Sequence, residues 1–187
     1  KSSIVLRRGP IAWRPVRFVG LDGPQLAAEV LKLVDAHRRP HDAAVPPRVK
    51  VDANGVGASV FDALASYATS DRGSGKLLVV GVMSSAAPTA KPREHANLRA
   101  QMWFELAAWL RTGAIAADDA LEADITTPEF KFARDRRLLV ESKDDIKKRL
   151  GRSPDDGDAL CLAVYDPPEF THAEATADDF IGLEFTR

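Results

Sequence analysis

The segment Ser153–Leu160 constrains the fold more than any other, because it sets carboxylates into the first turns of an otherwise apolar helix. Ser153 predicts the N-cap of that helix, and Asp156 stands three residues later, as in a capping box. This pattern explains Asp156 but leaves Asp158, which begins an apolar run, unexplained. Asp155 and Asp158 share a helix face, so a divalent cation could bind between that face and another carboxylate. Taken alone, the segment favours a helix start over a metal site.

A second acidic position follows a short β-branched segment. Residues 48–52 predict a strand that ends on Asp52, and Gly55 and Gly57 predict a tight turn into a helix that begins near Val56. In α/β proteins, functional residues gather where strands end beside glycine turns. A turn in which Asp52 only caps the next helix explains the segment about as well.

Hydrophobic patterning predicts the other elements of an α/β chain. Further strands are predicted at 4–6, 11–19 and 77–82, a hairpin near Phe130 and Leu138, and further helices at 24–37 and 96–111. The continuous apolar run at 77–82 predicts a buried strand. Trp103 and Trp109 are expected to be core or interface residues.

Four segments in this order resemble the C-terminal nuclease domain of the large terminase subunit of tailed bacteriophages. They are residues 2–9, 51–57, 97–113 and 141–160. The resemblance implies an α/β, RNase H-like fold, in which a mixed sheet is flanked by helices. We assign the nuclease domain to residues 1–166. The acidic segment 167–187 is expected to be a docking or disordered tail.

The resemblance also implies a two-metal site for Mg²⁺ or Mn²⁺. Asp52 matches the acid at the end of the fourth strand and is the candidate to bridge both ions. Asp158 matches the acid of the last helix and is the candidate to hold one ion, with Asp155 as a nearby helper. The first-strand acid is expected a few residues before Ser2, so we expect the first strand to be missing from this chain. In phosphodiester hydrolysis, two such ions about 3.5–4 Å apart activate the attacking water and stabilise the leaving oxygen.

Charge gives no global attraction to nucleic acid, because the formal net charge is −1. Contacts with DNA would therefore come from local patches, and a basic cluster precedes the acidic helix. Its candidate DNA-binding members are Lys143, Lys147, Arg149 and Arg152. A solvated helix face balanced by Asp144 and Asp145 is an equally good interpretation of each residue.

Other features narrow the class of protein. Cys161 is the single cysteine, which excludes a disulfide framework within the chain. No apolar run approaches the length of a membrane span, so we expect no membrane partner and an intracellular setting, which for a phage protein is the host cytoplasm. The segment 73–76 fails the phosphate-loop pattern, so an ATPase would lie in a separate upstream region.

The sequence and the resemblance together predict a metal-dependent endonuclease that cuts concatemeric phage DNA. The implied partners are double-stranded DNA, an upstream ATPase domain, the portal and the small terminase subunit. One alternative keeps the RNase H-like fold but assigns a junction resolvase or transposase. Another is a non-catalytic docking module of a packaging motor, in which the acids only cap turns.

Overall fold

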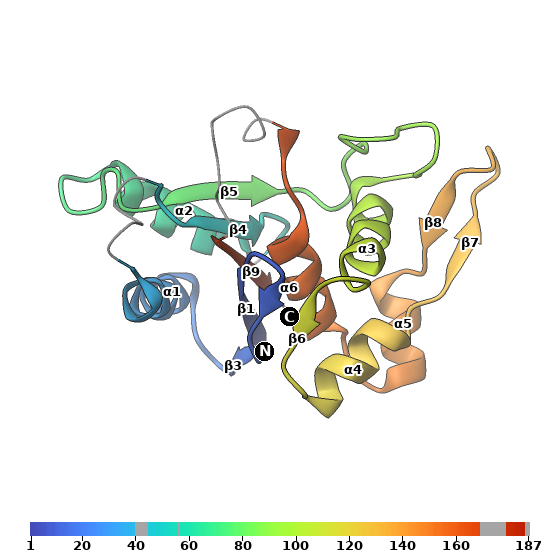
Figure 1. The fold of residues 1–187 in the computed structure, drawn as a ribbon, viewed down its shortest axis with the longest axis horizontal. Helices are drawn as coiled ribbons and strands as arrows, with labels where there is room; N and C mark the ends of the chain where they lie inside the picture. Colours follow the sequence, from blue (N-terminus) through green and yellow to red (C-terminus); the bar gives the residue numbers. More distant parts are fainter. Residues whose placement is uncertain (40–44, 56, 169–178, 186–187) are drawn as a thin grey trace.

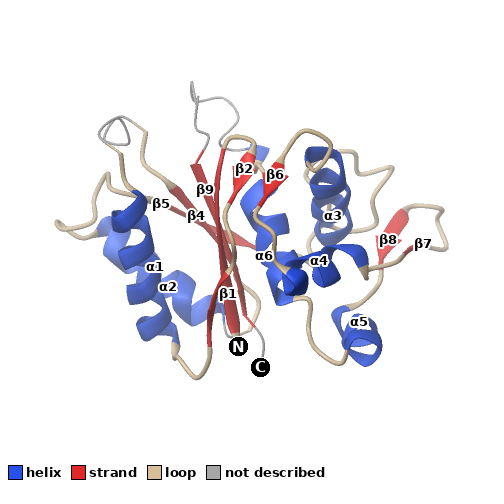
Figure 2. Ribbon diagram, turned by 60° about the horizontal axis from the view of Figure 1, so that its bottom comes forward, coloured by secondary structure: helices blue, strands red, loops and turns tan. Residues whose placement is uncertain are grey.

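A mixed β-sheet divides the molecule, with helices on both faces (Figure 1, Figure 2). The computed structural model describes residues 1–39, 45–55, 57–168 and, as backbone only, 179–185. The strands of this sheet are β1 (Ser2–Arg8), β2 (Ile11–Ala12), β3 (Val16–Phe18), β4 (Arg48–Asp52), β5 (Leu78–Val82), β6 (Ala114–Ile115) and β9 (Asp179–Phe185). Their order is β5-β4-β9-β1-β2-β6, and β3 also pairs with β1. A separate hairpin consists of β7 (Phe130–Phe132) and β8 (Leu138–Val140).

Helices cover the sheet unequally. They are α1 (Gly23–His37), α2 (Gly57–Thr69), α3 (Leu98–Trp109), α4 (Asp119–Thr126), α5 (Lys143–Leu150) and α6 (Asp155–Val164). Helices α1 and α2 pack on one face, whereas α6 lies on the other face with α3 and α4 outside it (Figure 2). This arrangement confirms the predicted mixed sheet flanked by helices.

The two faces of the sheet hold separate hydrophobic clusters. Ile4 and Val49 belong to the cluster under α1 and α2, whereas Val5 and Val80 belong to the cluster that includes α6 and α3. Adjacent strand residues point to opposite faces, so one strand contributes to both clusters. Because both faces of the central strands are covered, β4 is buried along its whole length.

Two predicted strands differ from the structure. The strand expected at 11–19 is split into β2 and β3, and Pro15 lies in the break, where it has no backbone N–H for a ladder. The strand expected to be buried, β5, is instead at the edge of the sheet, and Leu78 is 38% exposed. The predicted start of the second helix at Val56 lies outside the described residues.

The segment 167–187 contributes a strand to the sheet. Strand β9 lies between β4 and β1, parallel to β4 and antiparallel to β1. The sequence predicted a docking or disordered tail over residues 167–187. In the structure, residues 179–185 pair with two strands of their own chain. Of the helices in the described part of the chain, none is long and apolar enough to cross a membrane.

Candidate active site

Asp52 is held where β4 ends. Asp52 pairs in register with Val82 of the parallel strand β5, and the next residue donates its N–H to Val82 O at 2.9 Å. One carboxylate oxygen, Asp52 Oδ1, accepts hydrogen bonds from the Asn54 side chain at 2.7 Å and from the Asn54 backbone at 3.2 Å. Gly55 has a φ of 59°, which permits the tight turn that brings Asn54 back. Asp52 is 8% exposed, so its carboxylate orientation is fixed in a nearly buried position.

Asp158 approaches the same place from the first turn of α6. Its Oδ1 accepts a hydrogen bond from Trp103 Nε1 at 3.1 Å and one from Arg99 Nη2 at 3.2 Å. Both donors lie on α3, whose first turn is capped by the Asn97 side chain, which accepts from Ala100 N at 2.8 Å. Hydrogen bonds to a charged group are stronger than neutral ones, so these two donors orient the Asp158 carboxylate firmly.

Lys143 joins the two carboxylates. Its Nζ lies 3.3 Å from Asp158 Oδ2 and 3.7 Å from Asp52 Oδ2. The two carboxylate oxygens are therefore no further apart than the sum of these distances. Lys143 is the first residue of α5, and Ser142 caps that helix by accepting from Asp145 N at 3.2 Å. Lys143 and Asp158 follow Asp52 by 91 and 106 positions in the sequence, and the fold brings all three side chains together.

The donor set at this point suits a hard divalent cation. Asp158 Oδ2 is buried and receives no hydrogen bond within the described chain, so its charge faces the Lys143 ammonium group. The cavity between the acids has a volume of ≈ 10 Å³, about the space of one water molecule. Carboxylate oxygens are preferred ligands of Mg²⁺ and Mn²⁺, and the ammonium group supplies the positive charge that such an ion would bring. Within the described ranges, no group of three His, Cys, Asp or Glu side chains could hold a metal ion, so other ligands would complete the coordination.

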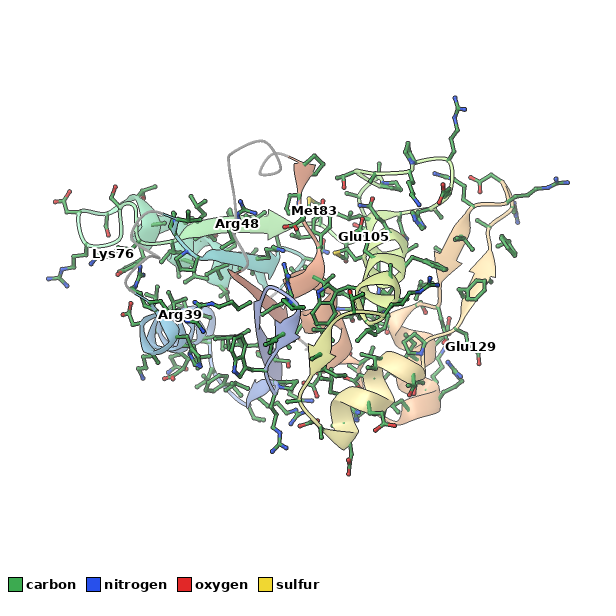
Figure 3. The ribbon with its side chains drawn as sticks, in the orientation of Figure 1. Arg39, Arg48, Lys76, Met83, Glu105 and Glu129 are labelled. Atoms are coloured by element: carbon green, nitrogen blue, oxygen red, sulfur yellow. The ribbon has the colours of Figure 1, made fainter. Side chains whose placement is uncertain are left out.

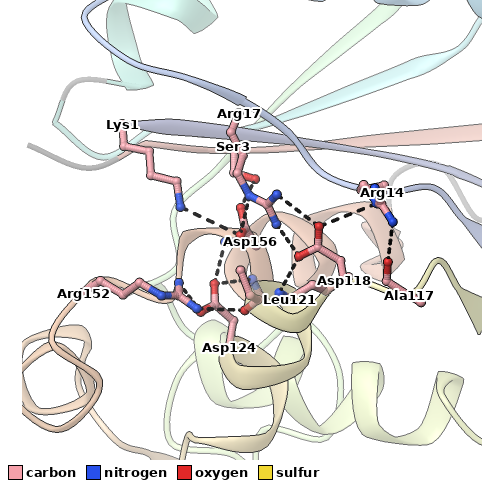
Figure 4. A network of polar contacts seen from close by, with 12 residues as sticks. Lys1, Ser3, Arg14, Arg17, Ala117, Asp118, Leu121, Asp124, Arg152 and Asp156 are labelled. Carbon is pink, nitrogen blue, oxygen red and sulfur yellow. Dashed lines mark hydrogen bonds and ion pairs between the residues drawn. The ribbon is translucent and has the colours of Figure 1, made fainter.

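The N-terminus of α6 is fixed by a buried polar network (Figure 4). Asp124 Oδ2 on α4 accepts hydrogen bonds from Asp156 N at 2.9 Å and Gly157 N at 3.3 Å. The predicted cap by Ser153 is wrong: Pro154 occupies the N-cap position, with no side-chain hydrogen bond to the helix. The cap comes from another helix, because a carboxylate on α4 reaches the free N–H groups and also benefits from the helix dipole.

The Asp156 side chain links α6 to other elements and does not form the predicted capping box with Ser153. Its Oδ1 accepts from Ser3 Oγ at 2.6 Å, and its Oδ2 accepts from Arg17 Nε at 2.9 Å. Arg17 also binds both oxygens of Asp118, at 2.6 and 3.1 Å (Figure 4). These hydrogen bonds to Asp118 and Asp156 raise the pKa of Arg17. The network ties α6 to β1, β3 and α4, and so fixes the position of Asp158.

Burial perturbs the acid that caps α6. Loss of solvation raises the pKa of Asp124 to about 6, although the charge of Arg152 opposes this effect. Arg152 Nη1 lies 2.5 Å from Asp124 Oδ1. The pKa of Asp124 thus lies closer to neutral pH than that of an ordinary aspartate.

The C-terminus of α6 is held by basic side chains. Arg7 Nε donates to Ala163 O at 2.9 Å, and Lys50 Nζ donates to Ala163 O at 3.3 Å and also to Tyr165 O. Desolvation lowers the pKa of Lys50, whose side chain is fully buried. Cations at the last carbonyls complement the helix dipole, so α6 is anchored at both ends.

The other predicted site residues differ in their positions and partners. Asp155 is buried, with 2% exposure, three residues before Asp158. Lys147 is on the exposed surface of α5. Arg149 pairs with Glu141 and with Glu129, which is labelled beside the hairpin in Figure 3. Arg152 pairs with Asp124. Of the four predicted DNA contacts, Lys143 is the one that the structure brings to the acids.

Arg99 and Trp103 are site residues that the sequence analysis missed. Arg99 also donates to Glu141 O at 2.6 Å, and its guanidinium lies 5.6 Å from the centre of the Trp103 ring. Trp103 was expected in the core and is indeed 8% exposed. A buried indole N–H needs an acceptor, and this requirement was the available signal for its contact with Asp158.

Comparison with known proteins gives one consistent result. No protein-family profile and no curated protein matches this sequence. Among solved structures, the nuclease domain of the large terminase subunit gp2 of bacterial virus Sf6, with manganese and beta-thujaplicinol, matches with a TM-score of 0.70. The match is 18% identical and covers 88% of this chain and 82% of that chain. A form with manganese (TM-score 0.69, 18% identity, 88% and 83% coverage) and one with calcium (TM-score 0.66, 18% identity, 85% and 79% coverage) agree.

These similarities extend over most of both chains, and the resemblance predicted from the sequence is confirmed at the level of the fold. The chain has the fold of the nuclease domain of a phage large terminase subunit.

Proposed function

We propose that this chain is a metal-dependent DNA endonuclease domain of a viral packaging terminase. The observation that carries the proposal is the meeting of Asp52 and Asp158 at one lysine, on a fold shared with terminase nuclease domains. The two acids come from a strand end and a helix, and neighbouring elements fix both carboxylates. Structural neighbours that carry manganese or calcium support the assignment of a divalent ion.

The proposed ligands follow from the site. Asp52 is the candidate to bridge two Mg²⁺ or Mn²⁺ ions, Asp158 to hold one of them, and Asp155 to assist from three residues earlier in α6. Mg²⁺ commonly keeps several waters and binds substrate phosphates, so few protein carboxylates suffice. When bound, the ions would supply an activated water and stabilise the leaving oxygen of a phosphodiester.

The surrounding residues prepare the acids for this role. Asn54 orients Asp52, whereas Arg99 and Trp103 occupy Asp158 Oδ1 and leave Oδ2 turned toward the shared point. Lys143 compensates the two negative charges until a divalent cation takes its place. The side chains of Asp52 and Asp158 are 11% and 7% exposed, so their electrostatic interactions are screened less than those at the open surface.

The wider assignment follows the same proposal. The substrate would be concatemeric double-stranded phage DNA in the host cytoplasm. The partners would be an ATPase domain of the same packaging protein, the portal and the small terminase subunit.

Nicking of supercoiled plasmid in Mn²⁺ tests this function. Asp52→Asn and Asp158→Asn should each reduce nicking by more than about 100-fold, because each removes a charged ligand. Asp62→Asn, at an exposed position on α2, is the matched control and should nick like the unmodified chain. Thermal unfolding of all variants shows whether the fold persists. Full nicking by folded Asp52→Asn and Asp158→Asn would refute the proposal.

A further inference from the structure

An open hollow adjoins the cavity between the acids. It has a volume of ≈ 330 Å³ and shares Ser84, Arg99 and Lys143 with the acid cavity, so the two are continuous. Its other lining residues are Ser85, Asn97, Lys131, Leu139, Val140, Ser142 and Asp145. A ligand that reaches the acids can therefore extend into the hollow.

The hairpin of β7 and β8 forms the far wall of this hollow. Phe130 and Phe132 are 59% and 67% exposed, and their rings contact each other with centroids 6.3 Å apart. Lys131 alternates with them along β7 and so belongs to the opposite face, which lines the hollow. The hairpin thus has an aromatic face away from the acids and a basic residue on the face toward them.

Lys131 is on an anchored element. Phe130 packs against Phe104 of α3, with ring centroids 5.6 Å apart. On the partner strand, Leu138 N donates to Glu94 O at 2.7 Å, and Leu138 O accepts from Ala96 N at 2.8 Å. These contacts hold the hairpin against α3 and the segment before it, so the distance from Lys131 to the acids is constrained.

Charge distinguishes Lys131 from the other basic residues near the acids. Arg99 and Lys143 already pair with Asp158, and Asp145 pairs with Lys148 at 3.2 Å. Lys131 forms no ion pair in the described part of the chain. Its charge interacts with that of Asp145, the acid of the hollow, but Asp145 already pairs with Lys148, so Lys131 can still contact an external anion. The volume is at the lower end of the range for small-ligand sites, which is enough for a short piece of one strand of a DNA duplex.

We propose that this hollow holds the DNA strand beside the cleaved bond, and that Lys131 contacts a phosphate of that strand. This inference rests on the proposed function and deepens it, because it names the path of the substrate strand. It transfers the backbone contact from Lys147, Arg149 and Arg152 of the basic cluster to the hairpin. A lysine on phosphate positions the strand without reading its bases.

Binding of a duplex oligonucleotide in EDTA, measured by fluorescence anisotropy at several salt concentrations, tests the inference. Lys131→Ala should weaken binding by about 2- to 5-fold, as expected for one exposed ion pair. It should also lower the slope of log affinity against log salt by about 0.7–0.9, as expected for one lost phosphate contact. Lys76→Ala is the matched control, since Lys76 is an exposed lysine outside the hollow to which no DNA contact has been assigned, and should leave both quantities unchanged. Lys131→Glu should weaken binding further.

The outcomes separate this inference from the proposed function. Equal affinity and salt slope for Lys131→Ala and the unmodified chain would overturn the inference, as would absence of DNA binding by the unmodified chain. Nicking in Mn²⁺ is a separate measurement: a chain that binds DNA through Lys131 but does not nick would refute the endonuclease and leave only the contact of Lys131 with a DNA phosphate supported. Lys131 is exposed, so thermal unfolding should not change.

Discussion

Replacing Lys143 by alanine should strengthen the binding of a divalent cation. Lys143 Nζ lies within 4 Å of both Asp52 Oδ2 and Asp158 Oδ2, at the point where the cation would bind. The ammonium group must leave that point before a metal ion can interact with both carboxylates. Alanine is a good helix former, and loss of a cation from the first turn of α5 suits the helix dipole, so the helix should persist.

The size of the effect follows from the two ion pairs. Unit charges at 4 Å interact by about 1 kcal/mol in water and about 4 kcal/mol at an effective dielectric constant of 20. The Lys143 side chain is 31% exposed, whereas that of Asp158 is 7% exposed, so solvent screening keeps the total well below the second figure. A cost of about 1–2 kcal/mol for displacing the ammonium group corresponds to a 5- to 30-fold change in Kd, roughly.

Isothermal titration with Mn²⁺ in the absence of DNA measures this change directly. Lys143→Ala should bind Mn²⁺ about 5- to 30-fold more tightly than the unmodified chain. Lys143→Arg, which keeps the positive charge, and Lys147→Ala, which removes a charge elsewhere on α5, should both remain near the original affinity. Unchanged or weaker Mn²⁺ binding by folded Lys143→Ala would show that the lysine does not compete with the metal.

Two further predictions concern the placement of α6. A Cβ at Gly157 would lie 2.9 Å from Trp103 Cη2 and 3.2 Å from Asp124 Cβ. Gly157→Ala should therefore lower the free energy of unfolding by about 1–3 kcal/mol through overpacking, partly offset by better helix propensity. Urea denaturation measures this change, and a more stable variant would contradict the prediction. Because burial raises the pKa of Asp124 from 3.8 to about 6, the folded chain holds this proton more tightly than the unfolded chain, and its contribution to stability decreases as pH rises from about 4 to 6. Asp124→Asn should lose this component of the pH dependence in urea denaturation, and identical pH profiles for the two proteins would disprove the role of Asp124.

The sequence marked the two acids for different reasons. Asp52 follows a β-branched strand, and Asp158 is a carboxylate in an apolar helix, so each is locally conspicuous. Their proximity is not a local property. It was expected from the resemblance, and the structure brings them together through the packing of α6 on the sheet.

The contacts that sequence analysis missed are long-range. Asp124 caps α6 from 32 residues away, and no periodicity marks it as a cap. Arg149 and Arg152 belong to a conspicuous basic cluster, yet their carboxylate partners, Glu129 and Asp124, neutralise them in the fold. Clustering of charge along the sequence therefore does not show which of these cations have a carboxylate partner in the fold.

Strand β9 shows a further limit of local patterning. Residues 179–185 include Phe and Ile, which favour strands, but a local pattern does not identify the partners of a strand. The neighbours of β9 in the sheet, β1 and β4, are more than a hundred residues earlier in the chain. Such pairing depends on the whole fold, since β propensity is mostly a matter of context.

Titration of Mn²⁺ by electron paramagnetic resonance tests the central claim most directly, because it detects the metal without relying on cleavage. The account predicts that the unmodified chain and Asp62→Asn bind Mn²⁺, and that Asp52→Asn and Asp158→Asn each lose most of this binding while they remain folded. Equal Mn²⁺ binding by all four proteins would contradict the claim that Asp52 and Asp158 form one metal centre.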